Sequence, residues 1–460
     1  MSDAMTMDMS RDLGLILPEI VVVLTGVAAL IAGMLRRHAA AMPVTVAGNL
    51  LAAALAIPLL GEDTQVFMGT YRVDDLAVWS KLVLLPTVAL VALMAVPEIR
   101  RTDREATVYS LFSLTTVGAL ALSGAGDIMF LVLGTVLTSL GSFTLVAYPR
   151  DDRATEAAMK YFVYGSVTGA VMIFGLTFWF GGSGSTLLTD LDQLDGRTLA
   201  AIAGFVAAIV GLGYKAAIAP FHFWAPDAYD GGPVVTAAYL SIVPKIGAIF
   251  ALAVIGRHLP ADIVDWRVII AALAVVSMTY GNLTALVQTN VVRLLAYSSI
   301  AQSGYFLLGV VAIGRDELAV QALVVFAAAY AAMNLGAFAV AGAVGRDLDV
   351  YRGIGRDRPW MGAAMAIFLF SLVGIPPMAG FFGKVLLFGA AIDAGYAWLA
   401  VVGILNSVLS LAVYLRIVVP MYQQTEPERS LGQRPWLVWG IALVLTLGIG
   451  LVAELLTRTA

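Results

Sequence analysis

Long apolar runs separated by short polar segments dominate this chain from one end to the other. Each run is close to the roughly 20 residues that an α-helix needs to cross the hydrocarbon core of a bilayer. The longest polar gaps lie near 182–197 and 345–359, too short to hold a soluble domain. We therefore predict an all-α integral membrane protein, with residues 1–460 forming a single polytopic membrane domain. About fourteen spans are expected, near 13–35, 42–60, 76–97, 106–124, 127–148, 158–181, 198–219, 234–257, 263–287, 293–314, 318–344, 360–390, 397–422 and 435–456.

The composition supports this interpretation. Hydrophobic residues make up 60% of the chain and charged residues 13%, against roughly 45–50% and about 25% in soluble domains. The net charge of −4 offers no basic surface for nucleic acid, so no nucleic-acid partner is expected. The chain has no cysteine and three histidines, which excludes disulfides and thiolate sites and argues against a metal centre. The expected solvent is the lipid bilayer.

Arginine is distributed unevenly between alternate loops. One set of alternate loops is rich in arginine, and the loops between them are acidic or neutral. The arginine-bearing set should therefore face the cytoplasm. An even number of spans then leaves both termini on the outer side. The short acidic N-terminal segment lacks the basic start of a signal peptide, so the first span should be retained. The arginine-bearing loops carry Arg36, Arg37, Arg100, Arg101, Arg104, Arg150, Arg153, Arg346, Arg352, Arg356, Arg358, Arg429 and Arg434.

Two of the apolar runs are interrupted by proline. Pro220 interrupts "GLGYKAAIAPFHFWAPDAYDGGP", and Pro376 and Pro377 interrupt "SLVGIPPMAGFFGK". Proline removes a backbone donor and clashes with the preceding turn, and the freed groups must face protein or water at membrane depth. Lys215 precedes the first break and Lys384 follows the second. Such a pair of broken spans is typical of inverted-repeat transporters, here with five-helix repeats near 106–257 and 263–422.

The five lysines all lie within or at the rim of apolar runs. An ammonium at the bilayer centre costs about 2.5–3.5 kcal/mol, but a desolvated lysine can lose its proton, whereas arginine effectively cannot. Lys81 and Lys160 lie near span ends, where a structural explanation, snorkelling or pairing between helices, is as good as a functional one. Lys215, Lys245 and Lys384 lie deeper and are predicted to form a proton relay.

Polar side chains in the neighbouring spans could complete such a relay. His222, beside the first break, is either a cap for the broken helix or a proton shuttle. The apolar setting of the glycine clusters indicates close helix packing, and no phosphate loop, carboxylate pair or nucleophile elbow is found. The candidate hydroxyl and amide groups are Tyr280, Ser298, Ser299, Gln302 and Tyr305.

Four segments of the chain resemble one known family. They are "EAAMKYFVYGS" (156–166), "YKAAIAPFHFWAPDAYDGGPVVTAAYLSIVPKIGA" (214–248), "YGNLTALVQTNVVRLLAYSSIAQSGYFLLG" (280–309) and "GIPPMAGFFGKVLLF" (374–388). Together they are similar to the antiporter-like membrane subunits of respiratory complex I, the NADH–quinone oxidoreductase. Lysine rather than glutamate in the second broken helix favours the branch called subunit N over subunit M. The end after about fourteen spans argues against subunit L.

The resemblance implies a fourteen-helix fold with two inverted five-helix repeats and two broken helices. It also implies a proton path through Lys215, Lys245 as the central connector, and Lys384, with Lys160 matching the family's "EAxxKYF" lysine. The chain would be a translocase subunit with no catalytic site, metal or cofactor of its own. Flavin, iron–sulfur clusters and quinone would belong to partner subunits, and the other membrane-arm subunits would be its neighbours in a bacterial inner membrane.

The sequence departs from the family pattern in its fifth span. Relatives usually carry there a glutamate that pairs with the first broken-helix lysine, but Thr135 or Val136 occupies the expected place and Asp127 lies about two turns away. Gln302 also stands where relatives often have histidine. Another carboxylate could serve Lys215, or coupling could differ. Two alternatives therefore stay open: a cation/proton antiporter subunit of the same superfamily, and a structural subunit with impaired transport.

Overall fold

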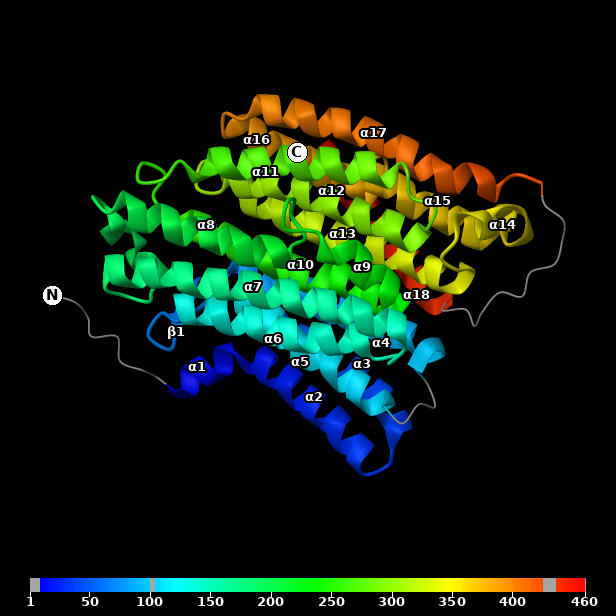
Figure 1. Ribbon diagram of the computed structural model, residues 1–460, viewed down its shortest axis with the longest axis horizontal. Helices are drawn as coiled ribbons and strands as arrows, with labels where there is room; N and C mark the ends of the chain where they lie inside the picture. Colours follow the sequence, from blue (N-terminus) through cyan, green and yellow to red (C-terminus); the bar gives the residue numbers. More distant parts are fainter. Residues whose placement is uncertain (1–8, 100–103, 425–435, 460) are drawn as a thin grey trace.

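The computed structural model describes residues 9–99, 104–424 and 436–459. Its helices run alongside one another in one bundle (Figure 1). Twelve described helices are long and apolar enough to cross a membrane, and two shorter apolar helices cover Pro359–Val373 and Trp436–Val452. The prediction of an all-α membrane fold is confirmed, while the count of about fourteen spans stays a prediction.

The N-terminal part wraps the lower side of the bundle in Figure 1 and contains a small hairpin. Strands β1 and β2 pair antiparallel, with Thr64 opposite Val73. The predicted all-α fold contains no strand there. The turn of the hairpin places Phe67, Met68 and Gly69 at left-handed φ values of 50°, 57° and 87°, and of these residues only glycine adopts such a φ without steric cost. The elements of this part are α1 (Met9–Leu15), α2 (Leu17–Met34), η1 (His38–Ala40), α3 (Ala41–Ala56), η2 (Ile57–Leu59), β1 (Thr64–Val66), β2 (Tyr71–Val73) and α4 (Asp75–Ile99).

Two successive groups of helices follow, and each has an interrupted helix in fourth place. The first group contains α5 (Glu105–Ser123), α6 (Ile128–Ala147), α7 (Asp152–Ser183), η3 (Leu188–Leu194), α8 (Thr198–Lys215), α9 (Trp224–Gly231) and α10 (Val234–His258). The second contains α11 (Trp266–Ala285), α12 (Val291–Ala312), α13 (Leu318–Val344), η4 (Leu348–Tyr351), α14 (Ile354–Asp357), α15 (Pro359–Val373), α16 (Ala379–Asp393) and α17 (Ala397–Met421), before α18 (Trp436–Thr459). The repeat limits 106–257 and 263–422 remain predictions.

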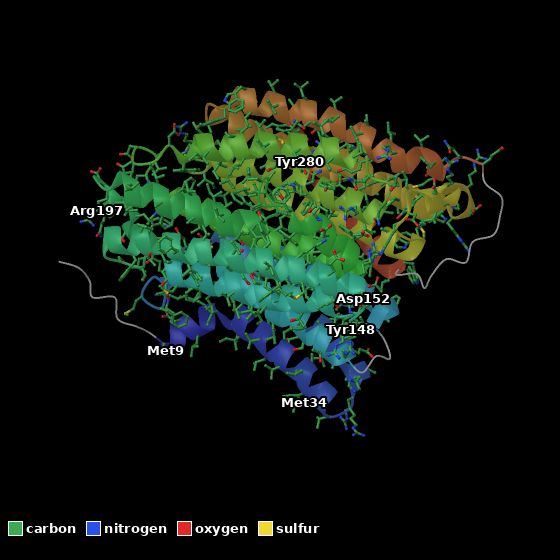
Figure 2. All side chains as sticks on the ribbon, in the orientation of Figure 1. Met9, Met34, Tyr148, Asp152, Arg197 and Tyr280 are labelled. Carbon is green, nitrogen blue, oxygen red and sulfur yellow. The ribbon has the colours of Figure 1, made fainter. Side chains whose placement is uncertain are left out.

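The centre of the bundle is formed by three helices. Helix α10 is buried along its whole apolar window, and α12 and α13 along most of theirs. Other helices leave large apolar side chains exposed, as is appropriate for a surface in contact with lipid or partner helices. The two ends of the bundle differ, because Met9 and Arg197 lie at one end and Tyr148 and Asp152 at the other (Figure 2). We call the second the arginine-rich end, since Arg104, Arg153 and Arg346 line a cavity there.

Candidate functional site

Both predicted interruptions are present, and each frees carbonyl groups inside the bundle. Helix α8 ends at Lys215 and α9 begins at Trp224, with a cis Ala219–Pro220 bond between them. Helix α15 ends at Val373 and α16 begins at Ala379, with a cis Pro376–Pro377 bond between them. The last four carbonyls of a helix have no partner within the helix. Each break therefore presents carbonyl acceptors, at the negative end of a helix dipole, in the middle of the protein.

Lys245 is bound by the carbonyl that the first break frees. Its side chain is buried in α10, and Nζ donates to the carbonyl oxygen of Ala216 at 2.8 Å. Nζ also donates to the carbonyl of Ser299 at 2.9 Å and to the hydroxyl of Ser303 in α12. The hydroxyl of Ser303 donates to Ala216 as well, at 2.6 Å. Lys245 thus joins the first break to the buried helix α12.

Lys384 is bound in the same manner at the second break. Nζ donates to the carbonyls of Leu372 and Val373 in the last turn of α15, at 2.9 and 3.0 Å. It also donates to the hydroxyl of Ser407 in α17 at 3.1 Å and lies 3.8 Å from the centre of the Tyr305 ring. The ammonium is therefore held by carbonyl dipoles, a hydroxyl and an aromatic face.

Helix α12 provides polar groups between these two lysines. The Gln302 amide donates to the carbonyl of Leu372 at 3.1 Å, the same oxygen that Lys384 contacts. Ser299, whose carbonyl accepts from Lys245, exchanges a hydrogen bond of 2.9 Å with the Tyr330 hydroxyl. Of the predicted filler residues, Ser298, Ser299, Gln302 and Tyr305 are buried, and only Tyr280 is exposed. Helix α12 thus carries contacts of both lysines, through Ser299 and Ser303 for Lys245 and through the Tyr305 ring for Lys384.

Lys215 has a different environment. It is fully buried, and its Nζ lies 5.5, 5.6 and 5.4 Å from the ring centres of Phe143, Tyr161 and Tyr214. Among residues 9–99, 104–424 and 436–459 it has neither a hydrogen-bond acceptor nor an acidic partner. We call these three rings the aromatic cage. The Ala216 carbonyl, one residue further along the chain, is its connection to Lys245.

The fifth-span departure is visible in the structure. Thr135 is buried in α6, where its hydroxyl donates to the carbonyl of Leu131 at 2.8 Å. Val136 is 41% exposed and points out of the bundle. Asp127 caps α6 by accepting from the Phe130 amide at 2.7 Å, and burial raises the pKa of this carboxyl despite that hydrogen bond. None of the three positions supplies a carboxylate to Lys215.

The remaining predicted residues fall in separate places. Lys81 is fully buried rather than at a membrane rim, and its Nζ lies 2.9 Å from the Glu19 carboxylate. The snorkelling explanation is therefore wrong for Lys81, and pairing is the correct one. Lys160 is half-exposed at the arginine-rich end, where it pairs with Glu156 and Asp227. His222 is buried against the rings of Phe223 and Tyr280.

Three acidic residues were not singled out from the sequence. Glu19 lies inside an apolar run, and this position was the available signal for a buried ion pair. Asp227 and Asp230 lie in the short half-helix α9 and bind cations from several segments. Their spacing of three residues, which places both on one helical face, was the corresponding signal.

Comparison with known proteins gives a consistent result. The model of the NADH:quinone oxidoreductase/Mrp antiporter transmembrane family matches residues 125–410. NADH-quinone oxidoreductase subunit N of Mycobacterium sp. (strain JLS) is 39% identical, covering 93% of this chain and 94% of that protein. Subunit N 1 of Streptomyces griseus subsp. griseus is 37% identical, covering 97% and 98%. A chain of respiratory complex I from Thermus thermophilus superimposes with a TM-score of 0.81 at 29% identity, covering 95% and 98%.

Proposed function

Because the chain belongs to the NADH:quinone oxidoreductase/Mrp antiporter transmembrane family, we propose that it translocates protons as a membrane-arm subunit of a complex I-type NADH–quinone oxidoreductase. The observation that carries the proposal is the position of Lys245. Its ammonium contacts the carbonyl freed by the first break, and the Ser299–Gln302 segment of α12 leads from it to the carbonyl that Lys384 contacts. One titratable group thus lies between two helix breaks.

The proposed path runs from Lys215 through Lys245 to Lys384. A lysine in this setting can exchange a proton as charges near it change, whereas a guanidinium would stay charged. Moving one proton against 100 mV requires about 2.3 kcal/mol, which corresponds to a change of roughly two pKa units. Rearranging the carbonyl and hydroxyl contacts of one ammonium is sufficient to supply a change of this size. Lys160 and His222 are proposed as peripheral members of the path.

The redox chemistry is assigned to other subunits. Flavin, iron–sulfur clusters and quinone are proposed to be held by partners, and this chain to receive their free energy as a change of charge at one end of the lysine path. The arginine-rich end is proposed to face the cytoplasm, with both termini outside, because arginine is retained on the cytoplasmic side of membrane proteins. The expected location is a bacterial inner membrane.

Substitution of Lys245 tests the proposal. In the assembled complex, Lys245→Ala is expected to lower the number of protons pumped per electron pair, because it removes the central titratable group. Lys245→Arg should fail in the same way, since arginine keeps the charge but does not release a proton. Arg197→Gln, an exposed position at the opposite end, controls for expression and assembly. The measurement is proton uptake by reconstituted vesicles, and an unchanged ratio in Lys245→Ala contradicts the proposal.

A structural subunit with impaired transport is the second candidate, favoured by the missing acidic partner of Lys215. This candidate predicts that neither Lys215→Ala nor Lys245→Ala changes the number of protons pumped per electron pair. A cation/proton antiporter subunit, the other alternative, predicts sodium-dependent transport and no co-purification with flavin and iron–sulfur subunits. Isolation in mild detergent with identification of the partner chains separates this alternative from the main proposal.

A further inference from the structure

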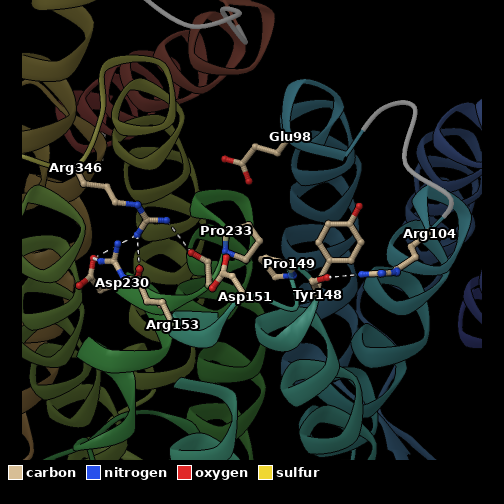
Figure 3. A pocket seen from close by; sticks show the side chains of 11 residues that line it. Glu98, Arg104, Tyr148, Pro149, Asp151, Arg153, Asp230, Pro233 and Arg346 are labelled. Carbon is tan, nitrogen blue, oxygen red and sulfur yellow. Dashed lines mark hydrogen bonds and ion pairs between the residues drawn. The ribbon is translucent and has the colours of Figure 1, made fainter. Parts of the chain in front are cut away.

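The half-helix α9 is held by an ion-pair cluster whose two acidic residues, Asp227 and Asp230, have no place in the proposed proton path. Asp227 and Asp230 lie on one face of this eight-residue helix. Asp230 pairs with Arg153 at 2.5 Å and with Arg346 at 3.3 Å, and it accepts a hydrogen bond of 2.7 Å from the Asn290 amide. Figure 3 shows Arg153 and Arg346 converging on Asp230 beside a cavity of about 680 Å³.

The partners of these two acids come from both predicted repeats. Arg153 and Lys160 belong to α7, in the first helix group, and Lys160 lies 3.3 Å from Asp227. Arg293 belongs to α12, in the second group, and lies 2.9 Å from Asp227. Arg346 follows α13 and also donates to the carbonyls of Asp230 and Gly232, at 2.6 and 2.8 Å. Helix α9 is therefore bound by segments of both helix groups, which are distant from it in sequence.

A second set of contacts connects α9 to the aromatic cage. The Trp224 indole donates to the carbonyl of Tyr214 at 2.8 Å. The same indole stacks on Tyr161, with ring centres 4.2 Å apart and an interplanar angle of 16°. Tyr161 and Tyr214 are two of the three rings around Lys215. Helix α9 is therefore in direct contact, through Trp224, with two of the three rings of the cage.

The second half of the other broken helix, α16, is not held by ion pairs among the residues that the structure describes. The charged residues of α16 are Lys384 and Asp393. Within the part of the chain that the structure describes, neither forms an ion pair of 4 Å or less. Helix α16 is joined to its neighbours through carbonyl and hydroxyl contacts of Lys384 instead. The two breaks thus differ in how their second halves are held.

We propose that Asp227 and Asp230 are positioning residues that pin α9 between the two helix groups and so hold Trp224 against the cage around Lys215. The positioning of α9 by these two residues does not depend on whether the chain translocates protons. The consequence for pumping rests on the proposed function, because it acts through Lys215.

Hydrogen exchange in the assembled, purified complex tests the positioning of α9. Asp230→Asn removes the charge that Arg153 and Arg346 share, and peptides covering 216–232 should exchange about tenfold faster. Peptides covering 374–393 should be unchanged. Asp393→Asn, the acidic position of the other half-helix, is the matched control and should alter neither region. Asp230→Glu should restore slow exchange, as a purely steric role for Asp230 would not predict.

A milder variant covers the case in which Asp230→Asn does not assemble. Arg293→Gln removes one partner of Asp227 and should accelerate exchange in 216–232 by a smaller factor. Exchange within twofold of the wild type in the assembled variants overturns the proposal. Pumping is measured on the same samples. Faster exchange with an unchanged pumping ratio would support the positioning role of Asp227 and Asp230 but would show that it does not affect Lys215. The proposed function is tested separately by Lys245→Ala.

Discussion

The buried ammonium groups of this protein are stabilised in three different ways. Lys81 has a carboxylate partner, Lys245 and Lys384 have helix-end carbonyls and hydroxyls, and Lys215 has aromatic faces. A carboxylate partner offers an ammonium a full opposite charge, whereas dipoles and ring faces stabilise it less strongly. The lysines beside the helix breaks are therefore the ones suited to exchange protons, and Lys81 is suited to a structural role.

The Glu19–Lys81 pair gives a stability prediction. Lys81→Met leaves the Glu19 carboxylate buried, with the Tyr71 hydroxyl, which donates to it at 2.5 Å, as its one remaining partner among the residues that the structure describes. We expect the free energy of unfolding to fall by about 3–5 kcal/mol, the usual result of breaking one side of a buried pair. The double variant Lys81→Met/Glu19→Leu should recover most of the loss. Unfolding in detergent measures both, and equal losses in the two variants would contradict a role for the charge pair.

The broken helices depend on close backbone packing as much as on proline. Gly380 is the second residue of α16, and a Cβ atom there would lie 1.9 Å from the carbonyl oxygen of Ser371 in α15. That oxygen belongs to the backbone, so no side-chain rotation relieves the contact. The two halves of the second broken helix can approach each other only because this position lacks a side chain.

A pair of glycine substitutions in α16 checks this packing. Gly380→Ala should lower the free energy of unfolding by about 1–3 kcal/mol, as overpacking does in well-packed interiors. Gly389→Ala is the control, since nothing lies within 4 Å of its added Cβ, and it should be neutral or stabilising by up to about 1 kcal/mol. Thermal unfolding of the two variants in the same detergent compares them. Equal effects would show that contact with Ser371 does not limit the second break.

The whole chain has two chemically different ends. The arginine-rich end contains the ion-pair cluster on α9, and the opposite end contains the hairpin, where Arg257 donates to Asp74 at 2.6 Å. The α9 cluster joins segments of both helix groups, and the Asp74 pair joins the N-terminal part to the end of α10. The central helix α10 is thus anchored at both ends, while its middle carries Lys245.

The natural absence of cysteine allows a direct test of orientation. Thr189 is exposed between α7 and α8, and Thr155 is exposed in the first turn of α7. Each is replaced by cysteine in a separate variant, Thr189→Cys and Thr155→Cys. A membrane-impermeant maleimide added to intact spheroplasts should label Thr189→Cys and should label Thr155→Cys only after lysis. The reason is the retention of arginine at the cytoplasmic face. The reverse labelling pattern would invert the proposed topology.

Much of the fold could be predicted from local sequence. A bilayer requires about 20 apolar residues for each span, and proline disfavours a continuous helix, so the spans and both breaks are predicted from adjacent residues. Proline alone does not decide a break, because Pro86, Pro244 and Pro420 lie inside helices that continue through them. The depth of Lys215, Lys245 and Lys384 follows from the same pattern. The hairpin at 64–73 could not be predicted, because three-residue strands are too short for a periodic signal.

The partners of the charged groups required the folded chain. Glu19 and Lys81 approach each other across α2 and α4, and Arg346 reaches Asp230 across 116 residues. The rings around Lys215 come from α6, α7 and α8. Hydropathy and proline act through neighbours along the chain, so sequence reveals where charges enter the membrane. Ion pairs, carbonyl contacts and ring packing act through space, so only helix packing selects which groups stabilise each charge.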